Sequence, residues 1–316
     1  MKNIFILGGS GFLGTHVCEK LARQGHRLTV ATRRRSNARH IQHLPGLTVV
    51  ELDVHDTRAL NQAIVGHEVV INLVAILHGT KTQFERVHVA LPKAIAHACC
   101  RHAVSQVIHV SALGADALQP NTAPSMYLRT KGEGEAVLLQ AAQGADAGDG
   151  EGKGFDLSIL RPSVIFGAED KFLNLFAQLQ RFAPVVPLAG AQARFQPVWV
   201  QDVAQAMVCC VQGVPNLPSP RTIEVCGPQV YTLKELVQIA GRLSGAGLRP
   251  VIPLPDWAAR LQARLMSLLP GEPLMSEDNL DSMRLDNVAT TGHAGLRSLG
   301  LEPAPLEPIA QTYLRR

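Results

Sequence analysis

Long hydrophobic runs are missing from this sequence. The most apolar stretch, residues 69–77, is interrupted by Asn72 and is much shorter than the roughly 20 residues that a membrane-spanning helix needs. CxxC motifs are missing too: none of the six cysteines has that spacing, and most lie in apolar helical runs. We therefore expect no transmembrane segment, no metal site and buried, reduced thiols in a cytoplasmic protein.

Charge of one sign is not concentrated in any long segment either. The net charge is only +4, and the arginines are scattered except for Arg33-Arg34-Arg35, so nothing predicts a nucleic-acid partner. What the chain does have is apolar content, with 46% hydrophobic and 18% charged residues over 316 positions. This composition is typical of a globular protein, and the length suffices for one large α/β domain with or without a smaller lobe.

The first fourteen residues carry the strongest motif. A short apolar strand over residues 2–7 runs into a glycine turn, and a helical pattern follows at once. Glycines let a phosphate approach the backbone closely, and the N–H groups and dipole of the first helical turn favour its charge. The motif therefore predicts a site for a dinucleotide pyrophosphate. Its residues are Gly8, Gly9, Ser10, Gly11, Phe12, Leu13 and Gly14.

Up to about residue 160, apolar runs rich in Val and Ile alternate with helical patterns. Such runs are typical of strands buried on both faces of a parallel sheet. Strands are expected at 27–31, 47–51, 68–73, 106–111 and 156–160, and helices at 84–102 and 125–142. We predict an α/β fold, with a Rossmann-type doubly wound parallel sheet over residues 1–165 and a smaller C-terminal α/β lobe over residues 166–316. Some segments of the lobe should return to the main sheet, and residues 143–152 should form a flexible loop at its edge.

The end of the second expected strand indicates which dinucleotide binds. An NAD site places Asp or Glu about 20 residues beyond the glycines for the ribose hydroxyls, whereas guanidinium groups bind a 2′-phosphate in a bidentate manner. This chain has arginines there and no acid, so it favours NADP(H) over NAD(H), with Arg33 and Arg34 as the expected contacts. Asp53, after the third strand, is placed either to bond the adenine edge or to cap a helix.

Tyr127 and Lys131 form the candidate acid–base pair. They lie four residues apart in an expected helix and so share one face. A phenol with a pKa near ~10 is a poor acid–base catalyst at neutral pH, and a neighbouring ammonium lowers that pKa. The pattern predicts Tyr127 as the acid–base group and Lys131 as its activator and a ligand of the nicotinamide ribose. A packed tyrosine followed by a surface lysine is the alternative explanation.

Together these motifs resemble the extended and atypical branch of the short-chain dehydrogenase/reductase (SDR) superfamily. Further segments make the chain look like the SDR-like accessory subunit of respiratory complex I and its bacterial relatives. Asp53-Val54, Asn72-Leu73-Val74-Ala75 and Ser111 belong to the resemblance to the superfamily, and the further segments are residues 159–167, 170–174 and 197–204. The resemblance covers residues 1 to about 210. It implies cofactor contacts at Val54, Val74, Ala75, Pro162 and Val164, with Arg161 and Pro162 after the sixth strand beside the nicotinamide.

Two positions depart from the family pattern. Extended members carry Ser-Ser-Ser/Thr after the fifth strand, and the last hydroxyl polarises the substrate carbonyl, but this chain has Ser111-Ala112-Leu113. Leu113 cannot donate a hydrogen bond, which would cost about 3 kcal/mol of transition-state stabilisation, on the order of a hundredfold in rate. Ser111 is then a catalytic or a merely structural hydroxyl, and Ser125 is a candidate replacement donor. His88 stands where the family has a helix asparagine, as a proton relay, an orienting residue or a packed one.

Residues 256–269 show an amphipathic helical pattern in the second lobe. Trp257, Leu261, Leu265 and Leu268 share one face, with Arg260 and Arg264 beside it. Basic amphipathic helices can lie on anionic membranes or dock on partners, and more often they cover their own domain. The pattern leaves all three open, and it adds a peripheral contact with the inner face of a membrane to the expected cytoplasmic location.

The sequence as a whole predicts an NADP(H)-binding atypical SDR protein, an oxidoreductase acting on a carbonyl, alcohol or quinone-type substrate. The alternative is a non-catalytic accessory or assembly subunit, or a redox sensor, associated with respiratory NADH:quinone oxidoreductase. Its partners would be the dinucleotide and a respiratory-complex or quinone-related partner. A nucleotide-sugar epimerase or dehydratase is a third candidate, weakened by Leu113 and by the missing acid after the second strand.

Overall fold

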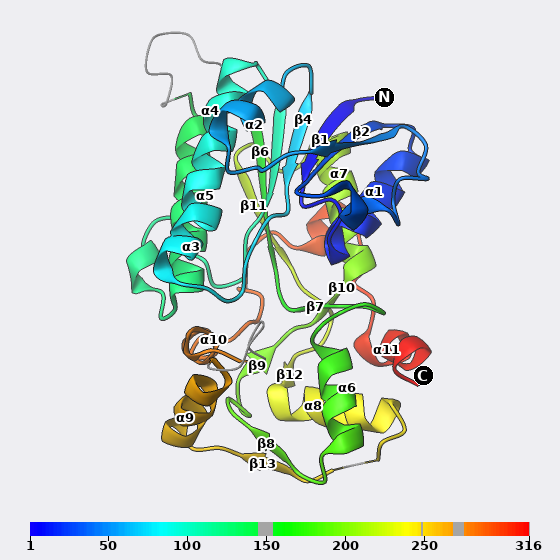
Figure 1. Cartoon of the computed structure of the whole chain (residues 1–316), viewed down its shortest axis with the longest axis vertical. Coiled ribbons are helices and arrows are strands. Elements are labelled where there is room, and N and C mark those ends of the chain that lie inside the picture. The colour runs from blue at the N-terminus through cyan, green and yellow to red at the C-terminus, as the bar shows by residue number, and fades with distance from the viewer. Residues whose placement is uncertain (145–153, 248, 268–274, 316) are drawn as a thin grey trace.

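A seven-stranded parallel sheet forms the centre of the computed structural model, which describes residues 1–144, 154–247, 249–267 and 275–315 (Figure 1). The strand order is β11-β6-β5-β4-β1-β2-β3. The strands are β1 (Asn3–Leu7), β2 (Arg27–Thr32), β3 (Leu47–Glu51), β4 (Val69–Asn72), β5 (Gln106–Val110), β6 (Asp156–Pro162) and β11 (Arg221–Val225). The order 3-2-1-4-5-6 is that of the doubly wound fold, so the predicted Rossmann-type sheet is confirmed.

Helices cover both faces of this sheet, which explains why its strands are apolar throughout (Figure 1). On one face, α1 (Phe12–Arg23) and α7 (Val200–Gln212) pack against β1 and its neighbours around Ile4, Ile6 and Val30. On the other, α2 (Thr57–Ala63), α4 (Leu91–Arg101) and α5 (Met126–Ala142) pack around Phe5 and Leu7. Alternate residues of β1 thus enter two different cores.

The expected elements agree with the structure to within a few residues. The expected helix at 84–102 is α3 (Lys81–Glu85) and α4 joined by η2 (Arg86–Ala90), a single π-helical turn that contains His88. Such turns occur often at functional sites. Of the loop expected at 143–152, residues 145–152 lie outside the described residues.

The C-terminal lobe has its own apolar core. Its helices are α6 (Leu173–Phe182), α8 (Leu233–Leu243), α9 (Asp256–Ser267), α10 (Glu277–Ser282) and α11 (Leu306–Leu314). Short strands pair as β7 (Ile165–Phe166) with β10 (Val198–Trp199), β8 (Val186–Leu188) with β13 (Val251–Pro253), and β9 (Arg194–Phe195) with β12 (Tyr231–Thr232). Single turns of 3₁₀ helix lie at η1 (Arg35–Ala38), η3 (Pro120–Thr122) and η4 (Leu296–Leu299). Because α7 and β11 return to the main sheet, the lobe is not one continuous segment, and the division at residue 165 stays a prediction.

The structure also describes the cysteines, the apolarity of the helices and the clustering of metal-binding side chains. All six cysteines are reduced thiols, and Cys18, Cys99, Cys210 and Cys226 are buried, as expected. Burial raises the pKa of each of these four thiols. Within the described ranges, no helix has the length and apolarity to cross a bilayer. In those same ranges, no cluster of three or more His, Cys, Asp or Glu side chains is arranged to hold a metal ion.

Candidate functional site

The glycine turn packs tightly between the first strand and the first helix. Gly8 has a φ of +81°, in the left-handed region, and a Cβ there would lie 3.2 Å from Leu73 at the end of β4. A Cβ on Gly14 would lie 2.4 Å from the Gly8 carbonyl oxygen, which is closer than van der Waals contact allows. The turn is therefore held directly against the point between β1 and β4 where the strand order reverses, which is where such sheets bind ligands.

The N-terminus of α1 is open to an anion. Its N-cap is Gly11, no side chain among the described residues caps it, and its first turn carries no acid. A surface cavity of about 430 Å³ opens beside it, lined by Ser10, Gly11, Phe12, Thr15, Glu19, His40 and Glu169. Leu13 is half-buried against the core. Since the N–H groups and the positive dipole of α1 meet at Gly11, which has no side chain, the glycine turn fits a pyrophosphate.

The end of β4 lies against the glycine turn. Asn72 accepts a hydrogen bond from the Val74 N–H at 3.1 Å, which places Val74 against Gly8, and Ala75 is exposed beside it. Val54 is half-buried on the α2 and α4 face. The dinucleotide contacts predicted after β1 and after β4 thus lie together.

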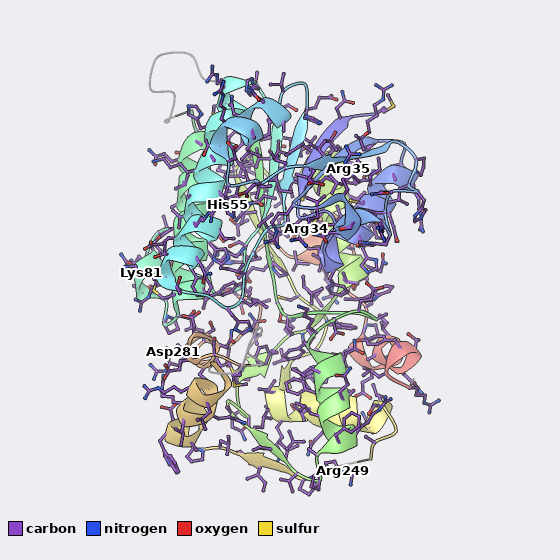
Figure 2. The ribbon with its side chains drawn as sticks, viewed as in Figure 1. Arg34, Arg35, His55, Lys81, Arg249 and Asp281 are labelled. Atoms are coloured by element: carbon purple, nitrogen blue, oxygen red, sulfur yellow. The ribbon has the colours of Figure 1, made fainter. Side chains whose placement is uncertain are left out.

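Basic side chains gather near the ends of β2 and β3. Arg33 and Arg34 follow the end of β2 and are exposed, and Figure 2 labels Arg34 and His55. The pKa of His55 is lowered, first by burial and then by the charge of Arg86, with a further contribution from Arg33. Arg86 in turn forms an ion pair with Asp53 at 3.7 Å. The sequence did not indicate His55 or Arg86 at this place, because no local pattern shows which loops converge.

Asp53 is not a helix cap. The residue that caps α2 is Asp56, whose carboxylate accepts from the N–H groups of Arg58 and Ala59 at 3.0 Å each. The Asp53 side chain is 56% exposed and accepts from the His55 N–H at 3.0 Å. Its capping interpretation is therefore wrong, and its predicted role at the adenine edge stays a prediction.

Tyr127 is the second residue of α5, and its phenol ring lies beside two other rings. Its ring is edge-on to His88, with ring centroids 5.5 Å apart, and to Phe84 at 6.4 Å. Desolvation of the phenol and then the charge of Asp278 raise the pKa of Tyr127 to about 12. The expected lowering of this pKa by Lys131 is absent, and the Lys131 ammonium instead donates to the Val110 carbonyl oxygen.

Lys131 is buried, not on the surface. Its ammonium donates to the Val110 carbonyl oxygen at 2.9 Å. Burial lowers the pKa of Lys131 to about 8, against the opposing charge of Glu135 one helical turn further on. Glu135 is fully buried and pairs with Arg161 through two hydrogen bonds. The alternative of a surface lysine is therefore wrong.

His88 is a neutral hydrogen-bonding residue. Its Nε2 accepts from the Ile76 N–H at 3.2 Å, so the proton is on Nδ1, which donates to the Thr130 hydroxyl at 3.0 Å. Burial lowers the pKa of His88 to about 2. Thr130 belongs to α5, so His88 orients the helix that carries Tyr127, and at neutral pH it carries no charge.

The hydroxyls near the fifth strand have different surroundings. Ser111 is buried, and its hydroxyl has no hydrogen-bond partner among the described residues, which leaves it available to a ligand or water. Leu113 is buried, and its N–H donates to the Pro162 carbonyl oxygen at 3.2 Å. Ser125 is the N-cap of α5, where its hydroxyl accepts from the Leu128 N–H and from Ser282. Ser125 is thus committed to the helix and does not replace the missing donor.

The segment after β6 differs from the expectation. Arg161 and Pro162 are the last residues of β6 itself, and Arg161 is held by Glu135. The Val164 N–H donates to Asn287 Oδ1 at 3.1 Å, and the Val164 carbonyl oxygen accepts from Val198. The backbone groups expected to meet the carboxamide are therefore engaged with the second lobe, and the cofactor contacts at Pro162 and Val164 stay predictions.

The amphipathic helix α9 packs in an unexpected orientation. Its small residues Ala259 and Ala263 are buried, whereas Trp257, Leu261 and Leu265 are 72%, 52% and 58% exposed. Leu268 lies outside the described residues. The predicted apolar face does not cover its own domain, because Arg260 and Arg264 on the adjoining face bind carboxylates of α10.

Comparison with known families identifies this arrangement. The model of the NAD dependent epimerase/dehydratase family matches residues 4–226, from β1 through β11. The chain belongs to this family. The glycine turn, the parallel sheet and the Tyr127/Lys131 helix all lie within the matched residues.

Individual relatives differ in what their names describe. The chain is 33% identical, over 98% of its length and 79% of the relative's, to "NADH dehydrogenase [ubiquinone] 1 alpha subcomplex subunit 9, mitochondrial" of Mus musculus. It is 32% identical, over 80% of its length and 74% of the relative's, to the ceramide reductase of Caulobacter vibrioides. The crystal structure of a UDP-glucose 4-epimerase from Thermotoga maritima matches with a TM-score of 0.72 at 18% identity, covering 99% of this chain and 97% of that one. This last likeness concerns the fold.

Proposed function

We propose that this family member binds NADP(H) at the β1–β4 switch point and is an oxidoreductase of the atypical SDR type. The observation that carries the proposal is the open glycine turn together with the exposed Arg33 and Arg34 directly after β2, where residues 32–35 include no acid. The N–H groups of α1 hold the pyrophosphate, and the two arginines hold the 2′-phosphate.

The chain's own residues define what the site does. The nucleotide, when bound, supplies the hydride chemistry. Tyr127 transfers the proton. Two hydrogen bonds hold its helix in place: His88 donates to Thr130 of α5, and Lys131 of α5 donates to the Val110 carbonyl oxygen of β5. Leu113 supplies no donor to a substrate carbonyl, so turnover should be slow, by about a hundredfold relative to a site with a hydroxyl there.

Nucleotide identity tests the proposal. Native mass spectrometry of the purified protein, followed by release of the bound nucleotide, should yield NADP(H). Arg33→Ala and Arg34→Ala should each weaken NADPH binding by about 10- to 100-fold and leave NADH binding nearly unchanged, because each loses a charge-assisted phosphate contact. Arg39→Ala, which removes an exposed arginine beyond η1, is the matched control. Co-purified NAD(H), or tighter binding of NAD(H), would contradict the assignment.

A second candidate is a nucleotide-holding subunit attached to a respiratory NADH:quinone oxidoreductase. Two observations favour it: the mouse relative's name, and the exposed Trp257, Leu261 and Leu265 on α9. Affinity purification from the native host should then recover respiratory subunits with the wild type and with the Gln262→Glu control. Recovery should fail with Trp257→Glu/Leu261→Glu, and equal recovery with all three proteins would exclude α9 as the attachment face.

The third candidate, a nucleotide-sugar epimerase or dehydratase, has less support. The solved epimerase is similar at an identity that concerns the fold alone. Leu113 and the missing acid after β2 both oppose this chemistry in the present chain.

A further inference from the structure

A carboxylate from the second lobe closes the N-terminus of α5. Asp278 accepts from the N–H of Met126 at 2.6 Å through one oxygen and from the N–H of Tyr127 at 3.1 Å through the other. The next N–H, that of Leu128, donates to the Ser125 hydroxyl, which also accepts from Ser282 of α10. The first three N–H groups of α5 are thereby satisfied, two of them by a residue about 150 positions away in the chain.

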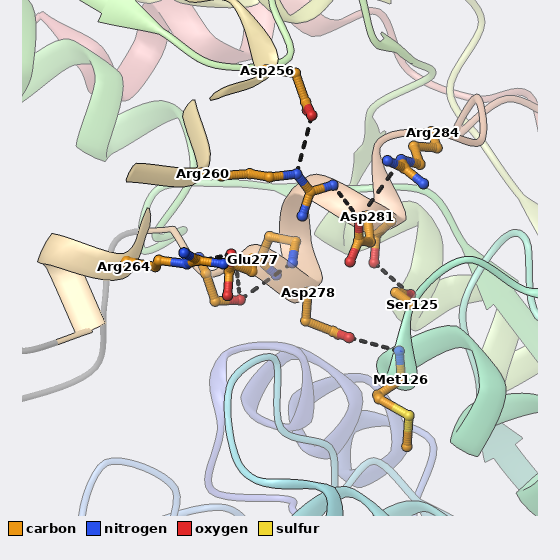
Figure 3. A network of polar contacts seen from close by, with 12 residues as sticks. Ser125, Met126, Asp256, Arg260, Arg264, Glu277, Asp278, Asp281 and Arg284 are labelled. Atoms are coloured by element: carbon orange, nitrogen blue, oxygen red, sulfur yellow. Dashed lines mark hydrogen bonds and ion pairs between the residues drawn. The ribbon is translucent and has the colours of Figure 1, made fainter. Parts of the chain in front are cut away.

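Asp278 is itself held in place by ion pairs between α9 and α10 (Figure 3). Arg260 of α9 binds Asp281 of α10 at 2.8 Å and Asp256 at 3.1 Å. Arg264 binds Glu277, the residue before Asp278, at 2.9 Å. Charged groups on both sides of Asp278 therefore fix the short helix that presents its carboxylate to α5.

The bond matters because Tyr127 is the second residue of the helix. The positive end of the α5 dipole would otherwise favour a phenolate there, and the Asp278 charge opposes it. His88 of η2, whose ring is edge-on to that of Tyr127, is neutral, and Lys131 one turn further along α5 donates to the Val110 carbonyl oxygen. Asp278 is thus the negative charge in this environment, and it acts on the backbone that positions the phenol.

We propose that Asp278 is a positioning residue for Tyr127, which couples the docking of the second lobe to the placement and charge state of the phenol. The inference rests on the proposed function for the role of Tyr127 in proton transfer. Its test requires no turnover, so the two can fail separately.

The chain has only three tyrosines, which makes the phenol directly observable. In protein labelled with ¹³C at tyrosine Cζ, Tyr127→Phe identifies the Tyr127 signal, and Tyr231 and Tyr313 report on the fold. Asp278→Asn should lower the titration midpoint of Tyr127 by roughly half a unit to one unit, the size expected of one neighbouring charge in partly solvated protein. Glu302→Gln removes an exposed carboxylate that pairs with Arg297 and takes no part in holding Asp278, and it should leave the midpoint unchanged. An unchanged midpoint in folded Asp278→Asn overturns the proposal.

The wild type provides a second test that holds even if Asp278→Asn does not fold. With ¹⁵N-tyrosine labelling, the Tyr127 amide should exchange slowly with deuterated water although it lies in the first turn of α5, because its N–H donates to Asp278. The amides of Tyr231 and Tyr313 are the comparison. A Tyr127 amide that exchanges as fast as an N–H without a hydrogen-bond partner overturns the proposal. If Asp278→Asn shifts the Tyr127 titration midpoint but the protein shows no turnover, the positioning role of Asp278 is supported and the oxidoreductase assignment is contradicted.

Discussion

The ammonium group of Lys131 lies 2.9 Å from the carbonyl oxygen of Val110, the last residue of β5, and is almost completely buried. A charged group in such surroundings destabilises the fold when it is protonated. The lysine is therefore retained at a cost in stability, which is what a functional residue in a site would show.

The Lys131→Met substitution tests this cost. Burial lowers the pKa of Lys131 to about 8 from 10.5, so the unfolded state binds more protons than the folded state between these pH values. Relative to Lys131→Met, the free energy of unfolding of the wild type should rise by about 3 kcal/mol from pH 8 to 10.5. Urea unfolding of both proteins across this range measures it. A constant difference between them would mean that Lys131 is not desolvated.

His88 should make the protein sensitive to acid. Its pKa lies near 2 in the folded state and near 6.5 in the unfolded state, so stability falls as pH drops below 6.5. Between pH 6.5 and 4.5 the wild type should lose about 3 kcal/mol more than His88→Gln. The exposed His43→Gln is the control and should behave as the wild type does. Equal acid sensitivity of His88→Gln and wild type would contradict a neutral, buried His88.

Gly14 and Gly11 should separate packing from ligand binding. Gly14→Ala brings a Cβ to 2.4 Å from the Gly8 carbonyl oxygen and should destabilise the fold by about 2–3 kcal/mol. Gly11 has a φ of −86°, which alanine can adopt, and its nearest neighbour would be 3.4 Å away. Gly11→Ala should therefore fold normally and weaken only dinucleotide binding. Thermal unfolding and NADPH titration distinguish the two, and unchanged binding by Gly11→Ala would remove Gly11 from the proposed phosphate site.

Leu113→Ser should restore a hydroxyl at the position where the family pattern has one. We expect turnover to rise by about 10- to 100-fold, the value of one preorganised donor. Leu113→Ala is the matched control, since it empties the same buried volume without adding a donor. Both variants should lose about 2–4 kcal/mol of stability. Equal rates for serine and alanine would show that Leu113 is not at the carbonyl-binding position.

Much of the fold could be predicted from local patterns. The runs at β1 through β6 are apolar because both faces of the sheet are covered, and each was expected to within two residues. Gly8 and Gly14 signal the turn because a side chain has no room there. Tyr127 and Lys131 share a helix face through their spacing alone. These features depend on residues near one another in the chain, which is why the sequence shows them.

The sequence by itself determined the order of the elements, the glycine turn and the pair on α5. The tertiary structure alone decided that Asp278 reaches Tyr127 and that Arg86 and His55 lie near Arg33. It also decided that α9 turns Trp257 outward. The physical reason is that pKa values and helix orientation follow from desolvation and from charges distant in the chain. The spacing of Tyr127 and Lys131 predicted a phenol made more acidic, whereas burial and Asp278 make it less so.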